Sequence, residues 1–301
     1  MVAILVSGPA VASLVSGPEV ASLVSGPAIA SPGLRAGDSE PGLRAGDSEP
    51  WEKETNMRRL LYIIRTINVT KTLWFNFKVF PFAVAKKLPV WLYGKVTFRS
   101  LTGKIVINGP ITSGMIRIGK NDHYVDTAIQ QCIWNVRGTL IFNGPAIFGH
   151  GSYVVISDNA TLEFGERESY FGTNLKIFCF DRIVIGSNVR AAWDCQFMDT
   201  TFHYVQNLNK NGEIGPLTKP IILGEDIWVG NRTTFTKGAV VPSKTIVASN
   251  SLVNKDFSNI EPYTLLAGMP ASVKATGMKR VFDLDVQSEM DEKYNYVRTH
   301  L

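Results

Sequence analysis

Hydrophobic residues return at every sixth position in the C-terminal part of the chain. Beginning at Leu223, the further apolar positions are Val229, Phe235, Val241, Val247 and Val253. Four residues after each of the first five comes a residue that is mostly small or β-branched, namely Ile227, Thr233, Ala239, Thr245 and Ser251. A period of six fits neither an α-helix, which repeats every 3.6 residues, nor the two-residue alternation of a half-buried strand.

A six-residue period predicts a coil of short strands, because each hexad can supply one flat face, one corner and one apolar side chain that points to the axis. Three faces make a coil of about 18 residues, and successive coils stack about 4.8 Å apart with their backbone groups paired. The sequence therefore predicts an all-β fold, a parallel β-helix, over residues 103–275.

The same register is present before residue 221. One run of apolar positions six apart is Ile185, Ala191 and Phe197, with Val189, Cys195 and Thr201 at the small positions. A looser run is Ile141, Ile147 and Tyr153. Residues 103–140 are rich in β-branched residues but have no clear phase, so the register is expected to be less regular there.

The first 56 residues have a different composition. A nonamer that begins at residue 2 returns at 11 and 20, and a second nonamer at 32 returns at 41. These copies lack the Gly-Gly-x-Gly-x-Asp motif of calcium-binding β-helices, so we expect a disordered low-complexity tail, with Met57 as the natural start. Gly-Pro pairs interrupt its uncharged stretch and no basic segment precedes it, so no secretory signal is expected.

The charge of the chain is unevenly distributed. The total is +5, but residues 1–56 carry three basic and seven acidic residues, which leaves +9 for residues 57–301. This excess favours anionic ligands such as phosphates, nucleotides or an anionic membrane surface. Three cysteines without a CxxC pair argue against disulfides and a zinc knuckle, and a reducing cytoplasm is the expected compartment.

Three further motifs accompany the hexads. They are the run Ile-Trp-Val-Gly at 227–230, the run Gly-Ala-Val-Val-Pro at 238–242 and the run Ala-Gly-Met-Pro-Ala at 267–271. Together they resemble the hexapeptide-repeat acyltransferases, and within these the sugar O-acetyltransferases of polysaccharide and lipopolysaccharide clusters, which are similar to maltose and galactoside acetyltransferases. The resemblance is good over 183–275 and looser back to Met57.

The resemblance implies a left-handed parallel β-helix that assembles as a homotrimer. It also implies transfer of an acetyl group from acetyl-CoA to a hydroxyl of a saccharide, with no metal and no nucleic-acid partner. Two alternatives stay open: a trimeric scaffold without chemistry and an N-acyltransferase for a nucleotide amino sugar. A metal hydratase on the same fold is disfavoured. The hydratase needs three histidine ligands, and His203 has no other histidine within fifty residues.

His203 is the candidate catalytic residue. Counting in sixes from Ile185 arrives at His203, after which the chain leaves the coil and re-enters it near Ile221. The stretch 193–203 also resembles the Asp-x-x-x-His segment in which the family places its catalytic histidine. A sugar hydroxyl is not ionised near neutral pH, and histidine suits the removal of its proton. The alternative is a corner histidine that only hydrogen-bonds the loop.

Neighbours of His203 have two possible roles each. Asp199, Asp194 or a backbone carbonyl could orient the imidazole, although Asp199 could also be a turn residue that binds local amides. Cys195 invites a Cys-His pair, but it occupies a small-residue position, so burial is the favoured interpretation. The polar loop 204–219 is either a lid over the acceptor or a solvated insertion.

The resemblance also implies where CoA binds, in the groove between adjacent coils of neighbouring subunits. The residues implied for the lining are Trp228, Gly230, Lys237, Gly238, Ala248, Ser249, Gly268 and Pro270. Lys274 or Lys255 would bind the phosphates. The family usually has a basic residue directly after Gly-x-Pro-Ala, whereas Ser272 stands there in this chain. Packing between coils is the alternative role for Trp228.

Two segments flank the predicted β-helix. Residues 57–102 mix basic and aromatic residues, which fits either a cap on the first coil or, over 57–90, peripheral contact with a membrane. Residues 276–301 form a C-terminal extension. The expected location is the cytoplasm, or the inner face of its membrane if the second interpretation of 57–90 holds.

Overall fold

The computed structural model describes residues 66–120 and 129–296. The low-complexity tail predicted for residues 1–56, together with His123 and His300, lies outside these ranges.

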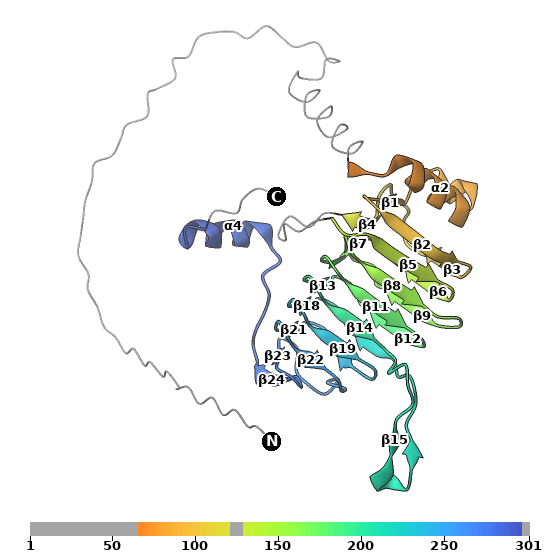
Figure 1. The fold of residues 1–301 in the computed structure, drawn as a ribbon. Helices are drawn as coiled ribbons and strands as arrows, with labels where there is room; N and C mark the ends of the chain where they lie inside the picture. The colour runs from red at the N-terminus through yellow and green to blue at the C-terminus, as the bar shows by residue number, and fades with distance from the viewer. Residues whose placement is uncertain (1–65, 121–128, 297–301) are drawn as a thin grey trace, which may run out of the picture. The chain divides into compact units, whose positions relative to one another are not determined.

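Three sheets run along the molecule, and their strands are parallel except for β24, the last strand of the first sheet (Figure 1). The first contains β1 (Val90–Leu92), β4 (Ile116–Lys120), β7 (Ala146–Gly149), β10 (Ser169–Phe171), β13 (Arg190–Ala191), β18 (Trp228–Val229), β21 (Ile246–Val247), β23 (Leu265–Ala267) and β24 (Ser272–Ala275). The second contains β2 (Val96–Leu101), β5 (Cys132–Val136), β8 (Tyr153–Ile156), β11 (Lys176–Cys179), β14 (Gln196–Met198), β19 (Thr234–Thr236) and β22 (Leu252–Val253). The third contains β3 (Lys104–Ile107), β6 (Thr139–Phe142), β9 (Thr161–Phe164), β12 (Arg182–Ile185), β17 (Ile221–Leu223) and β20 (Val240–Val241).

The chain visits the three sheets in turn, so each circuit is one coil of a parallel β-helix. The predicted all-β fold class is therefore confirmed. In the later coils the spacing is eighteen residues, since Ile222 pairs with Val240. In the earlier coils it is longer: Tyr170 pairs with Arg190, twenty residues on. The longer early coils explain why the six-residue period is less regular before residue 185, whereas Ile185, Ala191 and Phe197 already follow it and are buried.

The apolar anchors of the hexads form the core. All six, from Leu223 to Val253, are at most 1 % exposed. Aromatic rings continue this core between coils, and Phe197 stacks on Phe235 with ring centroids 4.7 Å apart. In the looser early run, Ile141 and Tyr153 are only half-buried, and Leu140 and Val154 occupy the interior instead. Two of the three positions of that run were therefore predicted in the wrong phase, whereas the third, Ile147, is buried.

The β-helix begins at Val90, before the predicted boundary of 103, because β1 and β2 already pair with β4 and β5. Two helices precede it, α2 (Val69–Val79) and α3 (Phe82–Ala85). Asn76 of α2 donates to the carbonyl of Val90 at 2.7 Å and accepts from its N–H at 3.1 Å. The hydroxyl of Thr72 accepts from the N–H of Leu92 at 3.0 Å. Side chains of α2 thus satisfy the strand edge that an uncovered first coil would expose.

The C-terminal end is closed by β24, which pairs antiparallel with β23, and the helix α4 (Leu284–Lys293) follows. No helix within residues 66–120 and 129–296 is long and apolar enough to cross a membrane.

Candidate active site

His203 lies where the chain leaves the β-helix, between β14 of the second sheet and β17 of the third. The intervening loop is a hairpin that projects from the coil (Figure 1), with β15 (Gln206–Asn207), the 3₁₀ turn η1 (Leu208–Lys210) and β16 (Glu213–Ile214). An antiparallel bridge between Thr200 and Thr218 closes its base. The N–H of Thr201 adds a hydrogen bond to the carbonyl of Leu217 at 3.1 Å. The loop base is therefore held by backbone pairing directly beside His203.

The imidazole of His203 is exposed. The backbone carbonyl of His203 accepts a hydrogen bond from the hydroxyl of Thr201 at 3.0 Å. Within the parts of the chain that the structure describes, no hydrogen bond reaches the imidazole itself, so both ring nitrogens are open to a ligand.

Phe202 sets the direction in which His203 leaves the coil. Its backbone has φ +60°, in the left-handed region that a bulky residue seldom adopts. The ring packs edge-on against Phe178 and Phe180, with centroid distances of 5.4 Å to each. This packing holds the turn and places the next residue outside the coil.

Asp199 is fully buried and does not bind His203. Its two carboxylate oxygens accept the N–H groups of Phe180 and Asp181, each at 2.8 Å. Burial raises the pKa of the Asp199 carboxyl, and these N–H groups act in the opposite direction. Asp199 therefore binds the corner of the preceding coil, which is the structural alternative considered for it from the sequence.

Asp194 lies at the other end of β14 from His203. It has φ +60° and accepts a hydrogen bond from the side chain of Asn174 at 3.1 Å, while its second oxygen lies 3.9 Å from Arg232. Asn174, Asp194 and Arg232 lie at the same corner on three successive coils. Asp194 therefore contacts the corners before and after its own. The structure brings neither predicted carboxylate to the imidazole.

Cys195 is buried, and its Sγ lies 3.3 Å from the carbonyl oxygen of Gly230. Burial raises the pKa of its thiol to about 12. A thiol with that pKa is protonated at neutral pH and is a poor nucleophile. The structure agrees with Cys195 as a packing residue.

Lys237 lies beside the loop base. Its ammonium donates to the hydroxyl of Thr201 at 3.3 Å and to the carbonyl of Pro216. The next residue, Gly238, donates its N–H to the carbonyl of Lys219 at 3.2 Å. Lys237 and Gly238 thus occupy the same corner of the β-helix as His203, one coil further on.

Most other residues predicted to line a CoA groove lie at a different corner, between the first and second sheets. They are Trp228, in β18 at the edge of this corner, and Gly230, Ala248 and Ser249; Gly268 and Pro270 lie in the turn between β23 and β24, which both belong to the first sheet. Successive coils approach closely at this corner, since a Cβ on Gly230 would lie 2.4 Å from the backbone nitrogen of Ser249. One chain therefore divides the predicted cofactor residues between two corners, separated by the strands of the second sheet.

The C-terminal segment adds a residue that the motifs did not indicate. Trp228 is 40 % exposed, and the guanidinium of Arg280 lies 5.1 Å from the centre of its ring. The predicted phosphate ligand Lys274 is exposed on β24, and Lys255 lies over the ring of Phe257 at 5.1 Å. The only sequence signal for Arg280 is its place in a basic pair that follows the Ala-Gly-Met-Pro-Ala run.

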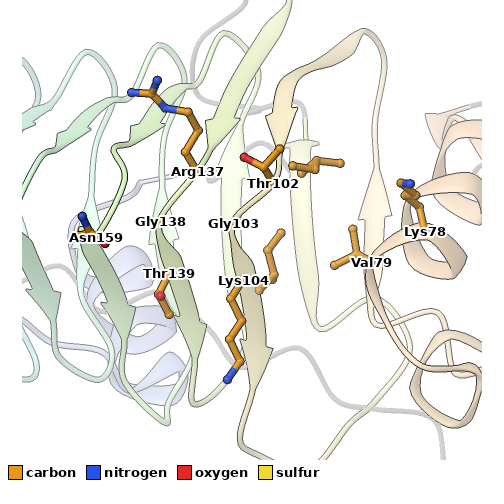
Figure 2. Close-up of a pocket in the computed structure, with 11 residues that line it drawn as sticks. Lys78, Val79, Thr102, Gly103, Lys104, Arg137, Gly138, Thr139 and Asn159 are labelled. Atoms are coloured by element: carbon orange, nitrogen blue, oxygen red, sulfur yellow. The ribbon is translucent and has the colours of Figure 1, made fainter.

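A cavity of about 730 Å³ lies elsewhere, at the N-terminal end of the β-helix, and Lys78, Lys104 and Arg137 are among its lining residues (Figure 2). No part of the loop that carries His203 lines it. Among residues 66–120 and 129–296, no three His, Cys, Asp or Glu side chains come together as a metal site would require.

Comparisons with known proteins give partial matches. The chain is 29 % identical to galactoside O-acetyltransferase of Escherichia coli (strain K12) over 129 residues, which is 43 % of this chain and 57 % of that protein. It is 34 % identical to a probable macrolide acetyltransferase of Lysinibacillus sphaericus over 56 residues, which is 19 % of this chain and 29 % of that protein. Both of these relatives are named as acetyltransferases.

The chain thus spans little more than half of the first of these acetyltransferases and under a third of the second. Among solved structures, a hexapeptide-repeat acetyltransferase of Vibrio cholerae O1 biovar eltor in complex with acetyl coenzyme A is 25 % identical, covers 38 % of this chain and 60 % of its own, and has a TM-score of 0.31. No protein-family model matches the chain.

Proposed function

We propose that the protein is an acetyl-CoA-dependent O-acetyltransferase that acts on a hydroxyl of a saccharide, with His203 as general base. The observation that carries the proposal is the exposed imidazole at the base of an extruded loop, with no hydrogen bond to any described residue. The names of the relatives support the acyl transfer, and the galactoside O-acetyltransferase among them supports a hydroxyl acceptor.

The chemistry assigned to His203 is a direct transfer. One imidazole nitrogen accepts the proton of the acceptor hydroxyl while the hydroxyl oxygen forms a bond to the thioester carbonyl carbon. When the carbon–sulfur bond breaks, the same nitrogen returns the proton to the leaving sulfur. Atoms and charge balance without an acyl-enzyme, and Cys195, buried and protonated, takes no part.

The two corners that carry the predicted residues support a site formed between subunits. Thr201, His203 and Lys237 lie at one corner, whereas Trp228 and Gly230 lie at another. A neighbouring copy in a trimer could place its Trp228 corner against the His203 corner of this chain and so complete the site. We therefore include the homotrimer in the proposal.

The loop supports an acceptor role on the same reasoning. Several of its apolar side chains are exposed in the single chain, with Tyr204 at 70 %, Val205 at 67 % and Leu208 at 81 %. Apolar side chains on an exposed hairpin are expected to become covered by a neighbour or a ligand. We assign the loop a place over the acceptor, facing an adjacent subunit.

Calorimetry of the full chain with CoA and acetyl-CoA is the first test, with sedimentation velocity on the same sample. A Kd between about 1 μM and 1 mM is expected. Absence of binding by a folded trimer would contradict the proposal and favour a scaffold.

An acceptor screen that follows free CoA thiol is the second test, with His203→Gln and the exposed-site control Asn254→Ala. The glutamine variant is expected to lose about 10²–10⁴-fold in kcat, while CoA affinity and Tm stay unchanged. Full activity of His203→Gln would exclude His203 as the base. If the enzyme acetylated only amino sugars, the proposed acceptor group would be an amine and not a hydroxyl.

A further inference from the structure

The helix α2 is apolar on the side that faces away from the core. Thr72, Phe75 and Asn76 are its buried residues. Four apolar residues point outward, and the apolar stripe is completed by one residue of α3: Val69 (46 % exposed), Leu73 (42 %), Trp74 (50 %), Phe77 (48 %) and Phe82 (72 %). If α2 only covered the first coil, it would need apolar residues on its core-facing side alone. The outward apolar residues therefore call for a second explanation.

The aromatic members of the apolar stripe lie against one another or against the first coil. The rings of Phe77 and Phe82 have centroids 6.0 Å apart, and Trp74 lies 6.3 Å from Phe98 of β2. These contacts form two aromatic pairs, one that joins α2 to α3 and one that joins α2 to β2. Continuous exposed apolar surfaces mark interaction sites more often than isolated apolar residues do.

The charge around the apolar stripe has a single sign. From residue 57 to residue 120 the sequence contains no Asp or Glu. The basic residues in the described part of this range are Lys71, Lys78, Lys86, Lys87, Lys95, Arg99, Lys104, Arg117 and Lys120. Lys78 belongs to α2, next to Phe77, and Lys86 and Lys87 form the turn that follows α3; all three are exposed.

The cavity at this end adds cations to the same region. Lys78 of α2 is part of its lining, together with Lys104 and Arg137, and hydroxyl groups of Thr102 and Thr139 are also present (Figure 2). Its charge is partly balanced on one side, because Arg137 lies 3.5 Å from Asp158. Lys78 therefore links the apolar stripe to a polar cavity that suits a phosphate-bearing headgroup.

We propose that the N-terminal end of the β-helix docks on an anionic lipid bilayer. The rings of Trp74, Phe77 and Phe82 enter the interface, and the surrounding lysines pair with headgroup phosphates, an arrangement typical of interfacial amphipathic helices. A second copy of the chain is a poor occupant because it would oppose one cationic surface with another. A nucleic acid would use the cations but not the aliphatic part of the apolar stripe.

This inference is independent of the proposed catalysis, and its test needs no substrate. The full chain is sedimented with large vesicles of phosphatidylcholine alone and with vesicles that contain 30 % phosphatidylglycerol, at low and at physiological salt. Binding to the anionic vesicles is expected to be at least about tenfold stronger and to weaken with salt. Equal affinity for both kinds of vesicle, or none for either, would overturn the proposal.

Two pairs of exposed substitutions separate the two contributions. Leu73→Gln with Phe77→Gln is expected to weaken vesicle binding more than about tenfold, whereas the control Val286→Gln with Tyr296→Gln, at exposed residues near the C-terminus, leaves it unchanged. Lys86→Gln with Lys87→Gln is expected to weaken it about thirtyfold, whereas Lys279→Gln with Lys293→Gln does not. Normal binding by either test pair would overturn the proposal.

Two further readouts distinguish a bilayer from other occupants. Brominated lipids are expected to quench tryptophan emission in the wild type, and Trp74→Phe is expected to remove most of that quenching. Sedimentation velocity is expected to give the same assembly for wild type and for the Leu73→Gln, Phe77→Gln pair. A smaller assembly in that pair would assign the apolar stripe to contact between copies. Displacement of the vesicles by duplex DNA, with the glutamine pair still binding DNA fully, would assign the surface to nucleic acid.

Discussion

The ammonium of Lys237 lies 3.3 Å from the hydroxyl of Thr201, and it also binds the carbonyl of Pro216. One side chain from the next coil thus holds both strands at the base of the loop. Thr201 in turn donates to the carbonyl of His203. The position of His203 therefore depends on a lysine 34 residues further along the chain, which the sequence had assigned to the cofactor.

Lys237→Met tests which role dominates, because methionine keeps the apolar stem and removes the ammonium. We expect the loop 204–219 to be cleaved faster in limited proteolysis and kcat/KM for the acceptor to fall about tenfold, with CoA affinity unchanged. Lys244→Met is the control, because Lys244 is exposed and lies at another corner, between β20 and β21. A selective loss of CoA affinity would return Lys237 to the cofactor site.

Asp199→Asn is expected to destabilise the fold by about 1–3 kcal/mol, because an amide supplies one acceptor oxygen where the carboxylate supplies two for buried N–H groups. Urea unfolding measures the change. Asp158→Asn is the control, since Asp158 is exposed and its ion pair with Arg137 is expected to contribute under about 1 kcal/mol.

The difference in the free energy of unfolding between the wild type and Asp199→Asn is expected to depend on pH, because the pKa of the Asp199 carboxyl is raised. Between its unfolded and folded pKa values the folded protein binds more protons than the unfolded chain, so this group makes the protein less stable as pH rises. The wild type should therefore gain stability relative to Asp199→Asn as pH falls from neutral toward the ordinary carboxyl range. A gain in the opposite direction would show that the N–H hydrogen bonds outweigh burial.

Trp228→Ala is expected to weaken CoA binding about tenfold without a change in Tm, since the ring is already 40 % exposed. Arg280→Ala should weaken it to a similar extent if the guanidinium above that ring binds a phosphate. Calorimetry measures both, with Arg182→Ala as the control for lost charge. Unchanged affinity in both variants would assign the pair to packing of the C-terminal segment.

Phe235→Ala removes one ring of a stacked pair in the core, and we expect a loss of about 3–5 kcal/mol in the free energy of unfolding. Phe82→Ala, at a ring that is 72 % exposed, should change it by less than about 1 kcal/mol. A similar loss in both variants would mean that Phe82 is covered in solution.

The repeat made the fold predictable to different degrees along the chain. Between residues 222 and 252 the paired strands are eighteen residues apart, so each interior side chain falls six positions after the last, and Leu223, Val241 and Val253 were assigned correctly. Before residue 191 the coils are longer, as in the twenty-residue step from Tyr170 to Arg190. A period that changes length leaves no fixed phase, and Ile141 was misplaced for that reason.

The candidate site was also only partly predictable from the sequence. His203 was selected as a candidate because a polar residue stands where the count of six expects an apolar one, and its catalytic role stays a proposal. The role of Asp199 was not decided, because its partners Phe180 and Asp181 belong to the preceding coil. Stacking brings residues together that are about one coil apart, and no local pattern distinguishes a carboxylate that binds that coil from one that faces a histidine.

The sequence by itself determined the coil, its interior positions from residue 223 to residue 253, the break at His203 and the excess of positive charge over residues 57–301, since each is a property of residue order. Tertiary structure decided what each polar side chain touches, including Lys237 at the loop base, Arg280 on Trp228 and the outward face of α2. Those contacts join residues far apart in the chain, and they depend on which corners and helix faces the winding of the coils brings together.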